Sequence, residues 1–161
     1  MTRSLLIVFI VMSAITAQAQ QAMQSTSRVH VFRLGPHQDL KKSLVAWAQL
    51  HKIKAAVVVT CVGSLEQYTL RFANQENGTS LAGHFEIVSL TGTISETSTH
   101  LHLAVSDSTG QTTGGHLLDG NLIYTTTEIA IAELPDLAFG RETDTTYGYK
   151  ELTVKRRSSK P

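Results

Sequence analysis

The sequence predicts an α+β fold: a mainly antiparallel β-sheet with one principal flanking helix in a single compact domain. Two observations lead to this prediction. Only residues 37–52 repeat apolar residues at helical spacing, whereas most of the remaining chain consists of runs of β-branched and aromatic residues. Gly, Asp, Ser and Asn separate these runs at short intervals, and strands joined by short turns pair in an antiparallel way. No internal repeat and no second domain is visible.

The elements follow in order from these patterns. The alternating segment 28–34 predicts the first strand, which Gly35-Pro36 ends. The helix then presents an apolar face at helical spacing: Leu40, Leu44, Trp47 and Ala48. Further strands are expected at 55–62, 67–72, 84–94, 100–106, 111–118 and 121–134, with a loop rich in turn formers at 73–83.

Residues 1–19 are predicted to be a secretory signal peptide. They carry one positive charge, Arg3, then an apolar run over 5–15, and end in Ala17-Gln18-Ala19, the small-x-small pattern that signal peptidase cleaves. A membrane anchor is the alternative, but the run is shorter than the ~20 residues that span a bilayer. We therefore expect cleavage after Ala19, a secreted or periplasmic protein, and no membrane contact after cleavage.

The rest of the chain divides into three parts. Residues 20–27 are expected to be a disordered polar leader, 28–154 the folded domain, and 155–161 a basic C-terminal tail. The whole chain has a formal net charge of +1 at pH 7, and removal of the signal peptide, which carries one base and no acid, brings it to about zero. A neutral domain lacks the positive surface that drives binding to phosphate backbones, which argues against nucleic acid as a partner.

Two further residues are assessed on their own. Cys61 is the only cysteine and lies in an apolar run, so we expect a small buried hydrophobic side chain and no internal disulfide. Asn77-Gly78-Thr79 is a formal glycosylation sequon, which matters only if the source is eukaryotic.

Three histidines stand in the stretch "HLHLAVSDSTGQTTGGHLL" and are candidates for one site. His100 and His102 share one face of their strand because successive side chains alternate. A three-residue hairpin loop, 108–110, would end in a left-handed glycine and place His102 directly opposite His116, with His100 as a diagonal neighbour. A four-residue loop would turn His116 to the other face.

Three convergent imidazoles with a vacant fourth position are the ligand set of catalytic zinc, whereas structural zinc usually has four protein ligands. An open position would hold water and lower its pKa toward ~7. The alternative is that the histidines are polar residues on a hydrated sheet face. Gly114-Gly115 beside His116 indicates either a ligand site or a close backbone approach.

Several motifs in order resemble the PPC domain, the plants-and-prokaryotes-conserved domain. They are "CVGSLEQYTLRFAN", "GHFEIVSLTGTIS", the histidine stretch, "LIYTTTEIAIAEL" and "FGRETDTTYGYKELTV", within about 29–154. The resemblance implies an antiparallel sheet with a flanking helix, assembled as a homotrimer. In the prokaryotic type, the histidines that match His100, His102 and His116 bind a divalent metal, usually zinc.

The resemblance also bears on two other functions. Plant members of the family carry an AT-hook of the Arg-Gly-Arg-Pro type, which this sequence lacks, so DNA binding is only a distant alternative. The fold is also similar to that of α-acetolactate decarboxylase, whose metal is held by a His-x-His pair and a later histidine. That similarity concerns fold and ligands, not the reaction.

Two hypotheses of different class follow. The first is a metal-dependent hydrolase or lyase acting on a small molecule, with Arg71 holding a substrate carboxylate. Its candidate proton-transfer groups are Glu66, Glu86 and Glu128, each of which is otherwise explained as a solvent-facing strand residue. The second is a non-catalytic ligand-binding or assembly module whose metal is structural or senses a ligand.

Overall fold

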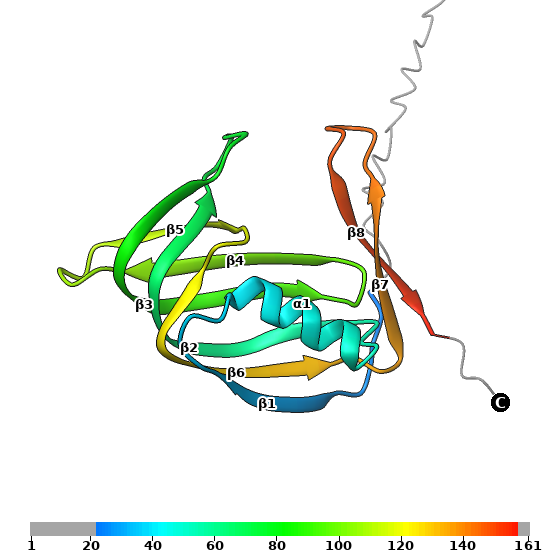
Figure 1. Ribbon diagram of the computed structural model, residues 1–161. Coiled ribbons are helices and arrows are strands. Elements are labelled where there is room, and N and C mark those ends of the chain that lie inside the picture. The colour runs from blue at the N-terminus through cyan, green and yellow to red at the C-terminus, as the bar shows by residue number, and fades with distance from the viewer. Residues whose placement is uncertain (1–21, 158–161) are drawn as a thin grey trace, which may run out of the picture.

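A six-stranded antiparallel sheet with one helix against it forms the domain (Figure 1), in a computed structural model that describes residues 22–157. The strand order is β1-β6-β2-β3-β4-β5, and β7 and β8 form a separate two-stranded sheet. The elements are β1 (Arg28–Leu34), α1 (Leu40–Leu50), β2 (Ala56–Arg71), β3 (Thr79–Ile94), β4 (Thr99–Ser106), β5 (Thr112–Leu117), β6 (Leu122–Glu133), β7 (Leu137–Thr143) and β8 (Lys150–Arg156). The predicted fold class is confirmed.

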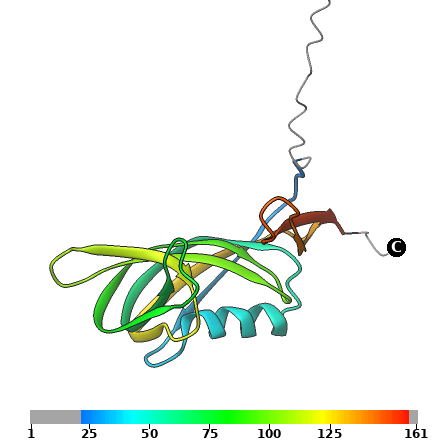
Figure 2. The same cartoon turned by 90° about the horizontal axis from the view of Figure 1, so that it is seen from above.

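The helix begins and packs as its sequence dictates. Asp39 caps it by accepting a hydrogen bond from the backbone N–H of Lys42 at 3.0 Å. Leu40, Leu44 and Ala48 are fully buried against the sheet. Trp47 stacks on Phe32 of β1 with a centroid distance of 5.5 Å. These contacts fix α1 to one face of the sheet, as Figure 2 shows.

Two predictions about strands were wrong. The segments 55–62 and 67–72 form one long strand, β2, because the backbone ladder continues through the bulges that we interpreted as a break. The expected loop at 73–83 ends earlier, since β3 begins at Thr79 and pairs it with Leu70. The hairpin of β7 and β8 was not predicted.

The sheet curls because β2 pairs with both β6 and β5 along one of its two edges. Its last residues pair with β5, Leu70 with Leu117 and Arg71 with His116, while β2–β3, β3–β4 and β4–β5 also pair. These strands therefore close a ring of pairings. Its interior is filled by buried leucines, among them Leu70, Leu103 and Leu117.

One row of paired residues runs across the sheet on the face opposite α1. It joins Val29, Ala132, Val57, Thr93 and His100 through successive registers of β1, β6, β2, β3 and β4. Directly opposed residues share a face of a sheet. The first two histidines of the cluster therefore lie on the face that α1 leaves open.

The ends of the described chain contact the domain. Ser25 and Thr26, in the predicted leader, hydrogen-bond the carboxylate of Asp136. At the other end β8 runs through Arg156, two residues into the predicted tail. The predicted signal peptide, 1–19, lies outside the described residues. Between residues 22 and 157 no helix is long and apolar enough to cross a membrane.

Cys61 is buried, as predicted, and is a free thiol. Burial raises the pKa of this thiol to about 12, so it stays protonated at neutral pH. A neutral buried thiol behaves as a small apolar side chain.

Candidate metal centre

The hairpin between β4 and β5 has the three-residue loop that the sequence predicted. The backbone N–H of Asp107 donates to the Gln111 carbonyl at 3.0 Å, and Gly110 has a φ of 83°. Asp107 Oδ1 accepts hydrogen bonds from Thr109 Oγ1 and from the backbone N–H groups of Thr109 and Gln111. These bonds hold the pKa of the Asp107 carboxyl below its usual range. The resulting register places His102 opposite His116.

The three histidines converge on the open face. One ring nitrogen from each lies within 4.8 Å of the others, and ring centroids are 5.1, 5.2 and 5.6 Å apart. A tetrahedral ion at about 2.0–2.1 Å from each nitrogen separates the nitrogens by roughly 3.3 Å. Small side-chain rotations would close this difference, so the cluster fits a metal ion. Whether it holds one in the protein stays a prediction.

Burial keeps two of the imidazoles in the form that binds metals. It lowers the pKa of His116 to about 4, with the charges of His100 and Arg71 adding to the effect. It also lowers the pKa of His100, with Arg141 and His102 contributing. A neutral imidazole offers a free lone pair to a metal. His116 Nδ1 is in addition buried without a hydrogen-bond partner in the described part of the chain.

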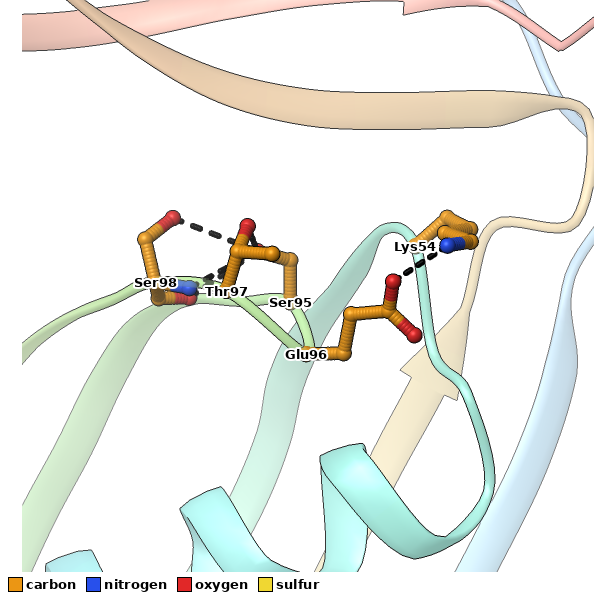
Figure 3. Close-up of polar contacts among 5 residues, drawn as sticks. All are labelled: Lys54, Ser95, Glu96, Thr97 and Ser98. Carbon is orange, nitrogen blue, oxygen red and sulfur yellow. Dashed lines mark hydrogen bonds and ion pairs between the residues drawn. The ribbon is translucent and has the colours of Figure 1, made fainter.

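The turn before β4 fixes where that strand begins. Ser95 Oγ accepts from the backbone N–H of Ser98 at 3.1 Å, and the Ser95 N–H donates to the Ser98 carbonyl at 2.8 Å. An ion pair between Lys54 and Glu96 ties this turn to the segment before β2 (Figure 3). The turn is therefore closed by its own hydrogen bonds and tied to the segment before β2, and His100 follows it by two residues.

Two glycines allow the strands around the cluster to approach. A Cβ on Gly115 would lie 2.8 Å from the carbonyl oxygen of Arg71, so this glycine marks a close backbone approach, one of our two explanations. Gly92 is tighter. Its φ is 135°, and a Cβ there would lie 1.9 Å from the carbonyl oxygen of His100.

An open pocket of about 1320 Å³ lies beside the cluster, with His100 and His116 in its wall. Arg71, our candidate for holding a substrate, lies in the same wall and pairs with His116 in the β2–β5 register. Four charged residues of this pocket were not predicted from the sequence: Glu76, Arg141, Lys150 and Glu151. Three of them come from the β7–β8 hairpin, whose approach depends on tertiary structure and leaves no local signal.

The three glutamates proposed for proton transfer lie elsewhere. Glu66 contacts His37, with 2.7 Å between Oε1 and Nδ1. Glu86 lines a separate pocket of about 330 Å³ together with His84. Glu128 is exposed on β6. None of the three lines the histidine pocket, which instead contains the carboxylates of Glu76 and Glu151.

Fold and site together define a class: antiparallel β domains that present, on one sheet face, a three-histidine cluster able to hold a metal. Residues 21–135 match the family described as the Plants and Prokaryotes Conserved (PCC) domain. The chain belongs to this family, which confirms the resemblance found in the sequence.

Solved structures of other proteins have the same fold. A hypothetical protein from Salmonella cholerae-suis (Salmonella enterica) is 44% identical, with a TM-score of 0.83 over 85% of this chain and 99% of that one. A metal-containing protein from Archaeoglobus fulgidus is 21% identical, with a TM-score of 0.73 over 83% and 99%. A PPC protein from Pyrococcus horikoshii is 23% identical, with a TM-score of 0.67 over 81% and 94%. The last two likenesses concern the fold alone.

The curated relatives are longer proteins. The bifunctional protein GlmU of Synechococcus sp. (strain JA-3-3Ab) is 42% identical over 144 residues, which are 89% of this chain and 23% of that protein. GlmU of Synechococcus sp. (strain JA-2-3B'a(2-13)) is 44% identical over 128 residues, 80% of this chain and 20% of that protein. The chain thus spans less than a quarter of the length of these relatives.

Proposed function

We propose that this chain is an exported protein that binds a divalent metal, zinc, through His100, His102 and His116 and uses it as a hydrolase or lyase on a small molecule. The observation that carries this proposal is the convergence of three ligand nitrogens within 4.8 Å of one another beside an open pocket. The metal content of the Archaeoglobus fulgidus protein of the same fold supports it. Export rests on the sequence of residues 1–19.

In this proposal the three imidazoles hold the metal and the pocket receives the substrate. Bound zinc would act as a Lewis acid and lower the pKa of a bound water, which is its usual role in hydrolysis. Arg71 would hold a negatively charged end of the substrate beside His116. Glu76 and Glu151 are the carboxylates placed to accept or donate a proton in the same pocket.

A non-catalytic ligand-binding or assembly module is the second candidate. The observation in its favour is that the chain matches only 23% and 20% of two longer relatives, as an appended domain would. In a module the metal would be structural, with all its coordination positions filled, or would sense a ligand without turnover. DNA binding finds no support in the nearly neutral charge of the chain.

Cobalt substitution separates the enzyme from a module with a structural metal. We expect the cobalt-loaded protein to absorb visible light, and its spectrum to change when azide is added, because an open coordination position would accept azide. A His102→Ala variant should lose the cobalt spectrum. A spectrum that azide leaves unchanged would contradict an open position and favour the module.

We further propose that the protein is a homotrimer assembled through the sheet face that α1 leaves open. Val29, Val31 and Val59 expose 61%, 75% and 58% of their surface in the single chain. Phe32 turns toward Trp47 of α1, and Leu34 is buried. Because successive side chains of a strand alternate between its two faces, Val29 and Val31 belong to the opposite, open face. Exposed apolar residues gathered on one face are typical of an interface between proteins.

A charge at Val31 is therefore expected to break the trimer. Light scattering should give three chains per particle for the parent and mostly single chains for Val31→Glu. Leu50→Glu is the matched control, because Leu50 is similarly exposed, at 78%, but ends α1 on the other side of the sheet. A trimer that survives Val31→Glu would exclude this part of the face from the interface.

A further inference from the structure

Two arginines from distant segments, Arg71 and Arg141, line the pocket beside the histidines. Arg71 ends β2 and pairs with His116 in the β2–β5 register. Arg141 lies in β7, and its Nη2 donates to Thr93 Oγ1 at 3.2 Å. Thr93 in turn pairs with His100 in the β3–β4 register. Each guanidinium is thus held next to one of the two histidines that line the pocket.

Neither arginine forms an ion pair with a carboxylate of residues 22–157. In the part of the chain between residues 22 and 157, no ion pair with an N–O distance up to 4.0 Å includes Arg71, Arg141 or Lys150. Their hydrogen bonds go to neutral oxygens: Arg71 to the Gln75 carbonyl, and Arg141 to the Lys150 carbonyl and Thr93. A guanidinium has five N–H donors, so each arginine keeps donors free for a ligand.

The charge balance of the pocket also favours an anion. Arg71, Arg141 and Lys150 supply three positive charges, and Glu76 and Glu151 supply two negative ones. A divalent metal at the histidines would raise the positive excess further. The two arginines are half-buried, whereas Lys150 and both glutamates are exposed to solvent, where water screens their charge, so the arginines dominate the balance.

We propose that this pocket binds a small oxyanion, a carboxylate or a phosphate group, between Arg71 and Arg141, with the remainder of the molecule directed at the three-histidine cluster. The planar guanidinium fork matches the two oxygens of such a group. The inference rests on the proposed function for the metal and adds the class of ligand. It also gives the β7–β8 hairpin a role, since this hairpin carries Arg141 and Lys150 to the site.

The test follows the arginine side-chain Nε–H signals by nuclear magnetic resonance in the purified protein, with and without zinc. The probes are glycolate, its neutral analogue glycolamide, and inorganic phosphate. We expect glycolate or phosphate to bind about tenfold or more tightly than glycolamide and to shift the signals of Arg71 and Arg141. The tighter of the two anions identifies the group as carboxylate or phosphate. Equal binding of glycolate, phosphate and glycolamide would overturn the proposal.

Variants separate a role in anion binding from a role in folding. Arg71→Met and Arg141→Met should each weaken anion binding by about tenfold. The same variants should bind zinc about two- to fivefold more tightly, because a like charge beside the metal is removed. Arg33→Met is the control, because Arg33 is exposed on β1 and hydrogen-bonds Thr126 away from the pocket. It should change neither affinity.

The outcomes distinguish this inference from the proposed function. Weaker binding of both zinc and anion in the arginine variants would show a structural role and overturn the inference. If the parent binds no zinc, the proposed function fails, and the oxyanion preference of the metal-free protein still decides the inference. If zinc binds but no anion preference exists, the inference fails alone.

Discussion

Replacing His102 with alanine is expected to weaken zinc binding by about two to three orders of magnitude. Structural zinc sites bind with roughly 10–16 kcal/mol from four ligands, so one ligand accounts for about 2.5–4 kcal/mol. His102 is exposed and lies directly opposite His116. Its loss should therefore remove a metal ligand and leave the core intact. Titration against a chromogenic chelator measures the affinity, and the unfolding transition of the metal-free protein checks the fold.

A histidine outside the cluster provides the matched control for this substitution. His84 is exposed on β3 and packs against Tyr124 in a tilted arrangement, with a centroid distance of 4.2 Å. The variant His84→Ala should bind zinc as the parent does. Equal zinc affinity for His102→Ala and His84→Ala would show that the three-histidine cluster is not the metal site.

Replacing Gly92 with alanine is expected to lower the free energy of unfolding by roughly 2–4 kcal/mol. Its φ of 135° is strained for any residue with a side chain, and the new Cβ would lie 1.9 Å from the carbonyl oxygen of His100. The backbone of β3 or β4 must shift to relieve this clash. The shift would also move His100, so zinc affinity should fall together with stability. Denaturant unfolding and zinc titration measure the two effects.

Gly148 serves as the control for the backbone conformation alone. Its φ is 76°, and a Cβ there would meet no atom within 4 Å. Gly148→Ala should therefore cost only about 1–2 kcal/mol, the penalty of the left-handed conformation, and should leave zinc affinity unchanged. If Gly92→Ala cost no more than Gly148→Ala, the close approach of β3 to His100 would be disproved.

The central part of the site was predictable because it depends on local rules. His100 and His102 share a face by strand alternation, and Gly110 at the end of the loop sets the register with His116. Both rules act within less than twenty residues of chain. The helix was predictable for the same reason, since the spacing of Leu40, Leu44 and Ala48 defines its buried face.

The remaining parts of the site depend on long-range packing and could not be predicted. Arg141 reaches Thr93 from a hairpin that lies 48 residues further along the chain. The hairpin shows little alternation of apolar and polar residues, and every residue of β8 is exposed or half-buried. The glutamates failed as candidates because the sequence shows which residues are acidic but not which end of a strand meets the histidines. Glu66 belongs to such a strand, β2, and contacts His37 instead.

The metal content of the purified protein tests the central claim most directly. Elemental analysis should find about one divalent ion per chain, zinc being the expected element, and His102→Ala purified in parallel should have lost it. A parent protein that holds no metal, even after zinc is supplied, would contradict the metal centre and leave a domain that acts by binding or assembly.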